Sequence, residues 1–322
     1  MSYKQLTQEQ RYQIEAYIGT GMKRSEIARE IGVHRSTVGR EIDRNSDLRL
    51  AGYRACAAIA ETRIRHERKR KKRVDKTTWA TVGTLLRLDW SPEQVTERLK
   101  LEGLPTVSHE TIYLHIYQNK LKGGDLYRHL RRRPYGYRKR IHKYCKRVGW
   151  DTRRPIAERP AVVETRARLG DWEIDTIVGR ERKGGVVTLV ERHSRLCLLR
   201  KVSTKSPDAV AEAVCEQLAP VKDKVLTVTS DNGFEFRRHR SIAERLDADF
   251  FFAAPYAPWQ RGTVENTNGL VRQYFPKKTD FSAVPDNLIR YATDRLNNRP
   301  RKALGFRTPN EIFHNQFVAL IT

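Results

Sequence analysis

The chain has 322 residues, with 63 Lys and Arg against 38 Asp and Glu, which gives a formal net charge of +25 at pH 7. This length allows two or three domains with a sizeable core, and so large a positive charge indicates a polyanionic partner. No apolar run approaches the roughly 20 residues that span a bilayer, and residues 1–10 lack the apolar core of a signal peptide. These features favour nucleic acid over a membrane as the partner and predict that the chain stays in the cytoplasm.

The N-terminal residues predict a helix-turn-helix domain over residues 1–48. Thr7 and Gln10 form a capping-box pattern ahead of a first helix, and a second helix follows around 25–31. The next segment, RSTVGREIDRN, has apolar residues spaced to pack inward, with arginines and short polar side chains near its start, as a recognition helix needs. An ordinary helical hairpin is the alternative. The candidate DNA-binding residues here are Arg35, Ser36, Thr37 and Arg40.

A second helical unit is predicted over residues 75–120, after a basic helical linker over 49–74 that either follows phosphates or only spaces the domains. Ser91 and Ser108 are positioned to cap two helices, in DWSPEQVTERL and SHETIYLHIYQN. The second of these helices has polar side chains on the faces that its isoleucines leave free. We therefore favour a second helix-turn-helix over a packing or dimerising bundle. Its candidate DNA-binding residues are His109, Thr111 and Tyr113, together with His115.

The composition shifts to Arg, Lys, Tyr and Gly between residues 122 and 154, a strip that is too polar to bury a core. Its tyrosines offer faces on which bases or sugars could rest, although exposed tyrosines in basic linkers often do nothing so specific. We predict a DNA-contacting basic linker over 121–160. Its candidate phosphate contacts are Arg131, Arg132, Arg133, Arg138, Lys139 and Arg140.

The four cysteines do not form a metal-binding pattern. They are Cys56, Cys145, Cys197 and Cys215, and none has CxxC spacing. His142 and Cys145 are spaced like half a zinc site, but no second pair follows at the distance that a zinc finger requires. We expect reduced cysteines and no zinc.

The remaining residues, 161–322, predict an α/β domain. Strands near 173–178, 185–191 and 195–202 form a meander, because turn residues separate them. A helical stripe after the meander predicts a crossover helix that leads to a strand over 225–230. The fold class expected from the whole chain is therefore multidomain, with helix-turn-helix units followed by a mixed sheet flanked by helices.

Three acidic residues of this domain are candidate metal ligands. Asp175 lies inside the first strand, where apolar neighbours require a carboxylate to be paired or bound to metal, and Asp171 and Glu173 are rivals for its role. Asp231 follows the later strand in SDNGFEF, where the alternative is a bare hairpin turn, but the next residues predict a helix. Glu265 lies on a polar stripe of a helix that begins at a proline, while an apolar stripe packs. The stripe of Glu265 also carries Arg261, Asn268 and Arg272, which are candidate DNA contacts.

These acids and their surroundings resemble the ribonuclease-H-like DDE transposases and integrases, and most closely the IS-thirty family of bacterial insertion-sequence transposases. The resemblance extends from Ile156 to about Phe313, with weaker similarity in the N-terminal third. The chain departs from the family in having Ile174 where Gly is common and Val264 where Asn is common. Four phrases carry the resemblance: IAERPAVVETRARLGDWEIDTIVG, SDNGFEF, PYAPWQRGTVENTNGLVRQYFPK and LNNRPRKALGF.

The resemblance implies that Asp175, Asp231 and Glu265 are the catalytic residues and the ligands of two Mg²⁺ ions, with Mn²⁺ as a substitute. Clustered carboxylates repel one another, and hard cations bound through oxygen relieve that repulsion. The resemblance also implies that water first attacks the DNA at the ends of an insertion element and frees a 3′-hydroxyl. That hydroxyl then attacks target DNA. The partners would be the terminal inverted repeats, target DNA and further copies of the chain, two or more, in a synaptic complex.

Two other classes of protein fit parts of the sequence. A metal-dependent ribonuclease of the same fold would need no sequence-reading module, so the N-terminal helices argue against it. A DNA-binding regulator without catalytic activity would not need three placed acids.

Overall fold

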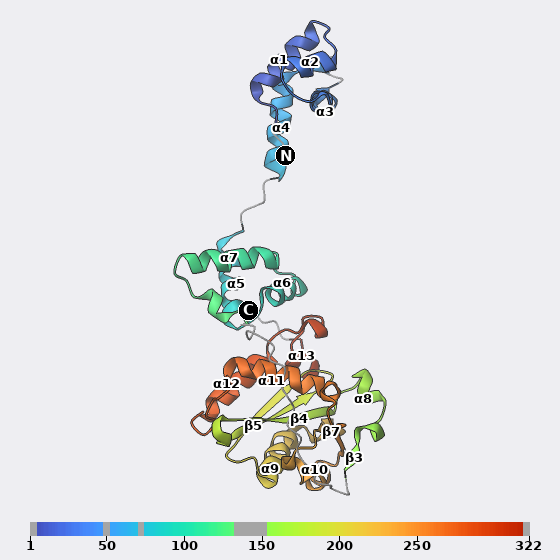
Figure 1. Ribbon diagram of the computed structural model, residues 1–322, viewed down its shortest axis with the longest axis vertical. Helices are drawn as coiled ribbons and strands as arrows, with labels where there is room; N and C mark the ends of the chain where they lie inside the picture. The colour runs from blue at the N-terminus through green and yellow to red at the C-terminus, as the bar shows by residue number, and fades with distance from the viewer. Residues whose placement is uncertain (1–4, 48–51, 70–73, 132–152, 318–322) are drawn as a thin grey trace. The chain divides into compact units, whose positions relative to one another are not determined.

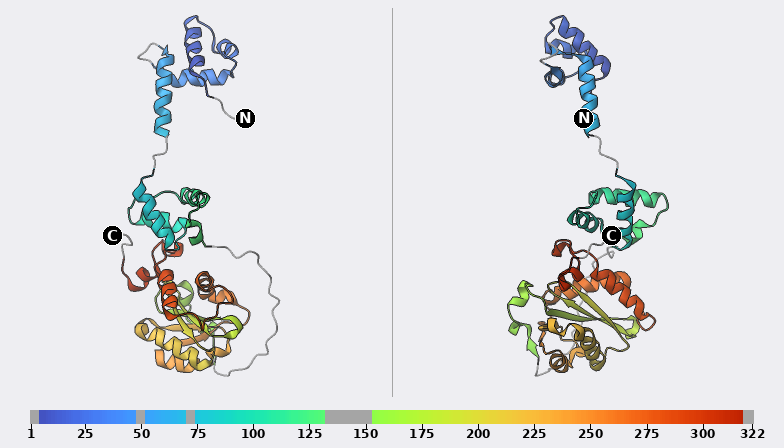
Figure 2. Two further views of the ribbon diagram at one scale, coloured as in Figure 1. Left: turned by 90° about the vertical axis from the view of Figure 1, so that its left-hand side faces the viewer. Right: turned by 180° about the vertical axis from the view of Figure 1, so that it is seen from behind.

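The computed structural model divides into two compact units, residues 1–73 and 74–322 (Figure 1 and Figure 2). Within the described part of the chain, no helix is long and apolar enough to cross a membrane. The structure describes residues 5–47, 52–69, 74–131 and 153–317.

The first unit is a small helical domain, as predicted. Thr7 and Gln10 form the predicted capping box at the start of α1, and α2 packs on α3 in helix-turn-helix order. Val38 and Ile42 of α3 point into the core beside Ile14 and Ile27, so the opposite face of α3 remains outside. The unit comprises α1 (Gln8–Gly19), α2 (Arg24–Glu30), α3 (Arg35–Asn45), the two-stranded hairpin β1 (Ser46–Asp47) and β2 (Gly52–Tyr53), and α4 (Ala55–Lys69).

The second unit begins with three helices and a short 3-10 turn. Ser91 and Ser108 cap α6 and α7 as predicted, whereas α5 had no separate prediction. Leu126 is 4% exposed and packs into the core of these helices. The prediction that residues from 122 onward bury no core is therefore wrong at this position, where a leucine interrupts the basic composition. The elements are α5 (Lys76–Arg87), α6 (Pro92–Leu101), α7 (His109–Leu121) and η2 (Leu126–His129).

A six-stranded mixed sheet follows, in the order β3-β8-β7-β4-β5-β6. The meander β4, β5 and β6 is antiparallel, while β7 and β8 run parallel to β4 on its other side. If the five longer strands, β4 to β8, are numbered 1 to 5 along the chain, their order across the sheet is 3-2-1-4-5. The second of them, β5, runs antiparallel to the first. This is the ribonuclease-H-like arrangement. The strands are β3 (Arg154–Pro155), β4 (Asp171–Val178), β5 (Gly185–Glu191), β6 (Cys197–Val202), β7 (Thr227–Ser230) and β8 (Asp249–Phe252).

Helices cover both faces of this sheet, and Figure 1 shows α11 and α12 on one side and α9 and α10 on the other. Trp172 and Ile174 of β4 pack with α9, whereas Ile177 packs with α11 and α12. Because side chains alternate along a strand, the odd-numbered residues of β4 face α11. The helices are α8 (Val162–Thr165), α9 (Pro207–Leu218), α10 (His239–Leu246), α11 (Gly262–Tyr274), α12 (Asp286–Asn297) and α13 (Pro309–His314), with short 3-10 turns between several of them.

A buried ion pair joins the helices at the start of the second unit to the last helix. Arg98 of α6 donates from Nη2 and Nη1 to the two carboxylate oxygens of Glu311 in α13, over 2.6 and 2.7 Å. Both side chains are almost fully buried, with exposed fractions of 1% and 2%. Beside them, Gln94 Nε2 donates to the carbonyl of Pro300 over 2.6 Å. These helices are therefore attached to the sheet domain by specific polar contacts within one unit.

Candidate active site

A column of polar residues runs along the face of the sheet that α11 covers. Asp171 accepts a hydrogen bond from the Thr227 hydroxyl of β7 over 2.8 Å. Two residues further on, Glu173 is in register with Thr229. Two residues beyond that lies Asp175, still on the same face because the side-chain period of a strand is two. The column therefore leads from a buried end to the half-buried carboxylate of Asp175.

Asp175 and Asp231 meet around a single guanidinium group. Arg261 Nη2 lies 3.4 Å from Asp231 Oδ2, and Nη1 lies 3.8 Å from Asp175 Oδ1. Burial raises the pKa of Asp175 to about 6, while Arg261 lowers it and Asp231 raises it. The two predicted metal ligands on the strands are thus close together, and the positive charge of one arginine only partly offsets the burial of Asp175.

The sequence predicts Arg261 as a DNA contact on a helix face. Its side chain is 14% exposed and also donates to the Ile174 carbonyl over 3.3 Å. The backbone explains this orientation, because Arg261 has φ −124° and ψ 36° and ends the 3-10 turn η7 (Pro258–Arg261) ahead of α11. The single helix predicted from Pro258 is therefore two segments, and the break between them turns Arg261 toward the carboxylates.

Helix α11 presents Glu265 and Asn268 one turn apart, on the stripe that the sequence predicts. Asn268 Nδ2 donates to Asp175 Oδ2 over 2.8 Å. Glu265 is exposed. The structure thus brings Asp175, Asp231 and Asn268 together and leaves the Glu265 side chain in solvent. Arg272, further along the stripe, donates to the carbonyls of Pro276 and Val178 over 3.3 and 3.5 Å.

Three buried polar atoms that lack a hydrogen-bond partner in the described structure belong to residues around Asp175. They are Asn268 Oδ1, Arg261 Nε and the hydroxyl of Thr188, which lies directly across from Asp175 in the β4–β5 register. Buried polar atoms of this kind ordinarily contact water or an ion. No three His, Cys, Asp or Glu side chains among the described residues lie close enough to hold a metal. The carboxylate and amide oxygens nevertheless suit a hard divalent cation, and Arg261 supplies positive charge between two of them.

The acids that neighbour Asp175 and Asp231 in sequence are buried and paired. Asp171 and Glu173, the rivals for the role of Asp175, are fully buried, and each is paired with an arginine. Glu235 is 5% exposed, accepts from the Thr176 hydroxyl over 2.8 Å and pairs with Lys205 over 2.5 Å. Glu235 follows Asp231 by four residues and lies in the same region, but it is not among the acids that the sequence predicts as metal ligands.

The predicted DNA-binding residues of α3 lie on its outer side. Arg35, Ser36 and Arg40 are exposed and Thr37 is half-buried. His34 caps the helix, because its Nδ1 accepts from the Ser36 backbone N–H over 3.2 Å. The start of α3 is thus both ordered and accessible.

The candidates on α7 have different surroundings. Tyr113 is 48% exposed, whereas the hydroxyl of Thr111 contacts that of Ser108 over 3.0 Å and His109 lies beside Glu110. His115 stacks on Trp79 of α5 with ring centroids 4.0 Å apart, so the prediction that it faces DNA is wrong.

Of the candidates in the basic strip, Arg131 is exposed. The others, Arg132, Arg133, Arg138, Lys139 and Arg140, lie outside the described residues.

A helix-turn-helix unit and a ribonuclease-H-like domain with two aspartates around one arginine define a DNA-processing enzyme. The family model described as "Helix-turn-helix domain" matches residues 2–45. Over 311 residues the chain is 44% identical to the transposase for insertion sequence element IS4351 of Bacteroides fragilis, covering 96% of this chain and 95% of that protein. It is 32% identical to transposase InsI for insertion sequence element IS30A of Escherichia coli, over 95% of this chain and 82% of that protein.

The chain therefore belongs to the IS-thirty family of insertion-sequence transposases, which are polynucleotidyl transferases acting on DNA. Among solved structures, the catalytic core domain of BIV integrase is similar over 46% of this chain and 95% of that one, with 23% identity and a TM-score of 0.37.

Proposed function

We propose that this transposase binds the terminal inverted repeats of an insertion element, cleaves the DNA at the element ends and transfers the freed 3′-hydroxyl into target DNA. In this proposal residues 1–48 recognise the ends, residues 75–120 and the basic linkers add contacts, and residues 161–322 catalyse the reaction. The protein acts as an oligomer of two or more copies, since two ends must be held in one synaptic complex.

The observation that carries the proposal is the convergence of Asp175 and Asp231 on Arg261 beneath α11. The carboxylates of Asp175 and Asp231, which share the guanidinium of Arg261, can instead bind a divalent metal ion. The oxygens of Thr188 and Asn268 that have no hydrogen-bond partner in the described structure are further oxygen donors nearby. Glu265 stands one turn before Asn268 on the same helix stripe and supplies the third carboxylate. We assign Asp175, Asp231 and Glu265 as the ligands of Mg²⁺ or Mn²⁺.

When bound, two such ions would activate the attacking oxygen and stabilise the leaving oxygen of the phosphodiester. The chain's own groups have separate tasks. Asn268 fixes the orientation of the Asp175 carboxylate through its hydrogen bond. Arg261 balances the negative charge of the two aspartates before the site is loaded, and its guanidinium is then free to contact a DNA phosphate.

The test is cleavage of a supercoiled plasmid that carries element ends, in Mg²⁺ or Mn²⁺, with the variants Asp175→Asn, Asp231→Asn and Glu265→Gln. Each substitution keeps the size of the side chain and removes one charge from the site. We expect end cleavage and strand transfer to fall together by about three orders of magnitude or more, while DNA binding is retained.

A suitable control is Glu244→Gln on α10, because Glu244 is exposed on a helix that covers the opposite face of the sheet. Neutralising Asp171 or Glu173 would also disturb a buried ion pair, so neither variant isolates the loss of one metal-binding charge. Full activity in any one of the three active-site variants would show that the ligands are assigned wrongly.

A further inference from the structure

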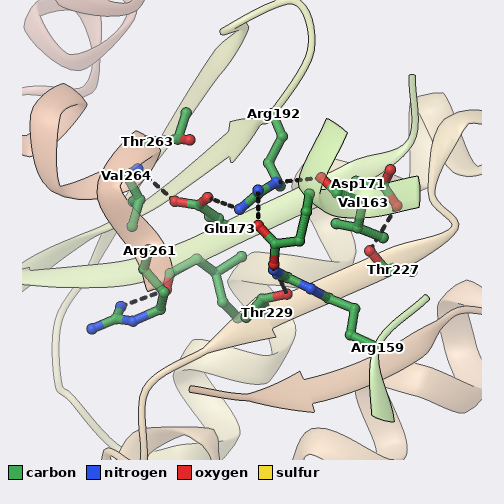
Figure 3. A network of polar contacts seen from close by, with 12 residues as sticks. Arg159, Val163, Asp171, Glu173, Arg192, Thr227, Thr229, Arg261, Thr263 and Val264 are labelled. Atoms are coloured by element: carbon green, nitrogen blue, oxygen red, sulfur yellow. Dashed lines mark hydrogen bonds and ion pairs between the residues drawn. The ribbon is translucent and has the colours of Figure 1, made fainter. Parts of the chain in front are cut away.

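Glu173 is a fully buried carboxylate that connects β4 directly to the start of α11. Its Oε2 accepts the backbone N–H of Val264 over 2.8 Å. Its Oε1 accepts from Arg192 Nη1 over 2.5 Å. Figure 3 shows both contacts, with Glu173 lying between Val264 and Arg192. The two carboxylate oxygens of Glu173 therefore bind two different parts of the chain, α11 and the residue that follows β5.

Arg192 is itself held from several sides. It is 3% exposed, and its Nε donates to the Val163 carbonyl over 3.2 Å. Its Nη2 donates to Glu164, which also accepts from Arg159. Arg159 in turn donates to the Thr229 hydroxyl of β7 over 2.9 Å. The arginine that orients Glu173 is thus fixed by contacts that lead back to the sheet (Figure 3).

The N–H group that Glu173 binds lies next to the residues of the candidate active site. The first four N–H groups of a helix have no partner within the helix, so an external acceptor determines where that end of the helix rests. Val264 directly precedes Glu265, and Asn268 follows one turn later. A shift of the first turn of α11 would move Glu265, Asn268 and the neighbouring Arg261 together.

We propose that Glu173 is a positioning residue of the transposase: it anchors the first turn of α11 to β4 and thereby fixes where Glu265 begins its approach to Asp175 and Asp231. The proposal rests on the function proposed above. It gives Glu173 no contact with DNA or metal. Two of the three acids on this face of β4 then have separate tasks, since Asp175 lines the site and Glu173 holds the helix that completes it.

The substitution Glu173→Gln removes one of the two acceptors, because an amide has a single oxygen. The charged donor Arg192 binds that oxygen more strongly than a backbone N–H does, so the amide nitrogen faces Val264 and that hydrogen bond is lost. A second variant, Glu173→Asp, keeps the charge opposite Arg192 but is one methylene too short to reach both partners. If the Glu173→Gln variant fails to fold, the Glu173→Asp variant still tests the proposal.

Asp171→Asn is the matched control. Asp171 is also fully buried on the same face of β4, receives two hydrogen bonds of 3.0 Å from Arg168, and accepts from Thr227. Its side-chain partners lie outside α11, so its neutralisation disturbs a buried ion pair without releasing that helix.

The first measurement is amide hydrogen exchange of the metal-free full chain. We expect the Val264 amide to exchange about tenfold faster in both Glu173 variants, relative to the amide of Leu189 in the interior strand β5 of the same variant. Asp171→Asn should leave this ratio unchanged. An unchanged ratio in a folded Glu173 variant would overturn the proposal.

The second measurement is plasmid end cleavage as a function of Mg²⁺ and DNA concentration. We expect the Glu173 variants to lose about 10- to 100-fold in maximal rate or in apparent Mg²⁺ affinity, with DNA affinity unchanged, whereas Asp171→Asn loses neither. Faster Val264 exchange with a normal cleavage rate would also overturn the proposal.

A wild-type chain that cleaves no element ends would refute the proposed function instead. In that case the exchange ratio and Mn²⁺ binding by calorimetry still decide whether Glu173 fixes α11. Mn²⁺ affinity that is equal in wild type and the Glu173 variants would count against the proposal.

Discussion

Asn268 on α11 donates a hydrogen bond to Asp175 on β4 over 2.8 Å, so the helix that carries Glu265 also orients an acid of the sheet. The other oxygen of Asp175 accepts from the backbone N–H of Thr176 over 2.9 Å. These two bonds fix the plane of the carboxylate. The Asp175 carboxylate is therefore oriented before any cation arrives.

Metal-free stability should depend on the ionisation of Asp175. Burial raises the pKa of Asp175 to about 6 from the ordinary value of 3.8. A raised pKa means that the folded state binds the proton more tightly, so this contribution to stability is complete below about pH 4 and is lost as pH rises through about 6. We expect the free energy of unfolding to fall between about pH 4 and 6, as measured by urea denaturation.

The variant Asp175→Asn removes that pH dependence. At pH 8 in the absence of divalent metal it should be about 1–2 kcal/mol more stable than wild type, because the gain from removing a buried charge exceeds the loss of one of the two hydrogen bonds from Asn268 and Thr176. A variant that is less stable than wild type at pH 8 would contradict the assigned cause.

Arg261 should compete with divalent cations for Asp175 and Asp231. The variant Arg261→Gln keeps much of the length and removes the charge, so we expect Mn²⁺ to bind several-fold more tightly by calorimetry, since no guanidinium has to be displaced. Arg272→Gln is the control, because it neutralises one charge on the adjacent helix α11, and within the described residues Arg272 donates to the carbonyls of Pro276 and Val178. Weaker Mn²⁺ binding in Arg261→Gln alone would mean that Arg261 supports the site instead of competing for it.

The exposed arginines of α3 should determine which DNA is bound. We expect Arg35→Ala and Arg40→Ala in the full chain to reduce the preference for element ends over random DNA by about 10-fold each, because base contacts specify sequence whereas phosphate contacts only position the protein. Gel-shift titration on both DNAs at fixed salt measures this ratio. An equal loss of affinity for the two DNAs would identify these side chains as phosphate contacts.

Glu311 should be needed for stability, although it is far from the candidate active site in sequence. Glu311→Gln leaves Arg98 buried with less compensation, and breaking a buried pair in this way costs about 3–5 kcal/mol. The exposed pair between Lys302 and Glu93 is the control, since Lys302→Ala should not change the unfolding midpoint measurably. Equal unfolding midpoints for Glu311→Gln and Lys302→Ala would show that the buried pair of Arg98 and Glu311 contributes little to holding α6 on α13.

Much of the fold follows from local patterns. The capping residues Thr7, Ser91 and Ser108 each begin a helix, as the sequence predicts. Such boundaries are predictable because a cap depends only on residues a few positions apart. Strand β3 could not be predicted in this way, because two residues including a proline become a strand only by pairing with β8.

The candidate site was predictable in part. Alternation along β4 puts Glu173 and Asp175 on one face, but it does not say that one is buried with Arg192 while the other stays half-buried beside Arg261. Those partners lie 19 and 86 positions away along the chain. Which acid becomes a structural anchor is decided by tertiary contacts, and a pattern with a period of two carries no information about them.

The pairing of Arg98 with Glu311 also has a consequence for the order in which the protein is completed. The two residues are 213 positions apart, so at about 5–20 residues per second a ribosome needs roughly 10–40 s to reach Glu311 after making Arg98. During that interval the Arg98 guanidinium can pair with Glu102, four residues further along, but not with Glu311. The contact between α6 and α13 can therefore form only after Glu311 has been synthesised. The first unit, residues 1–73, is thus made well before the second unit can close this contact.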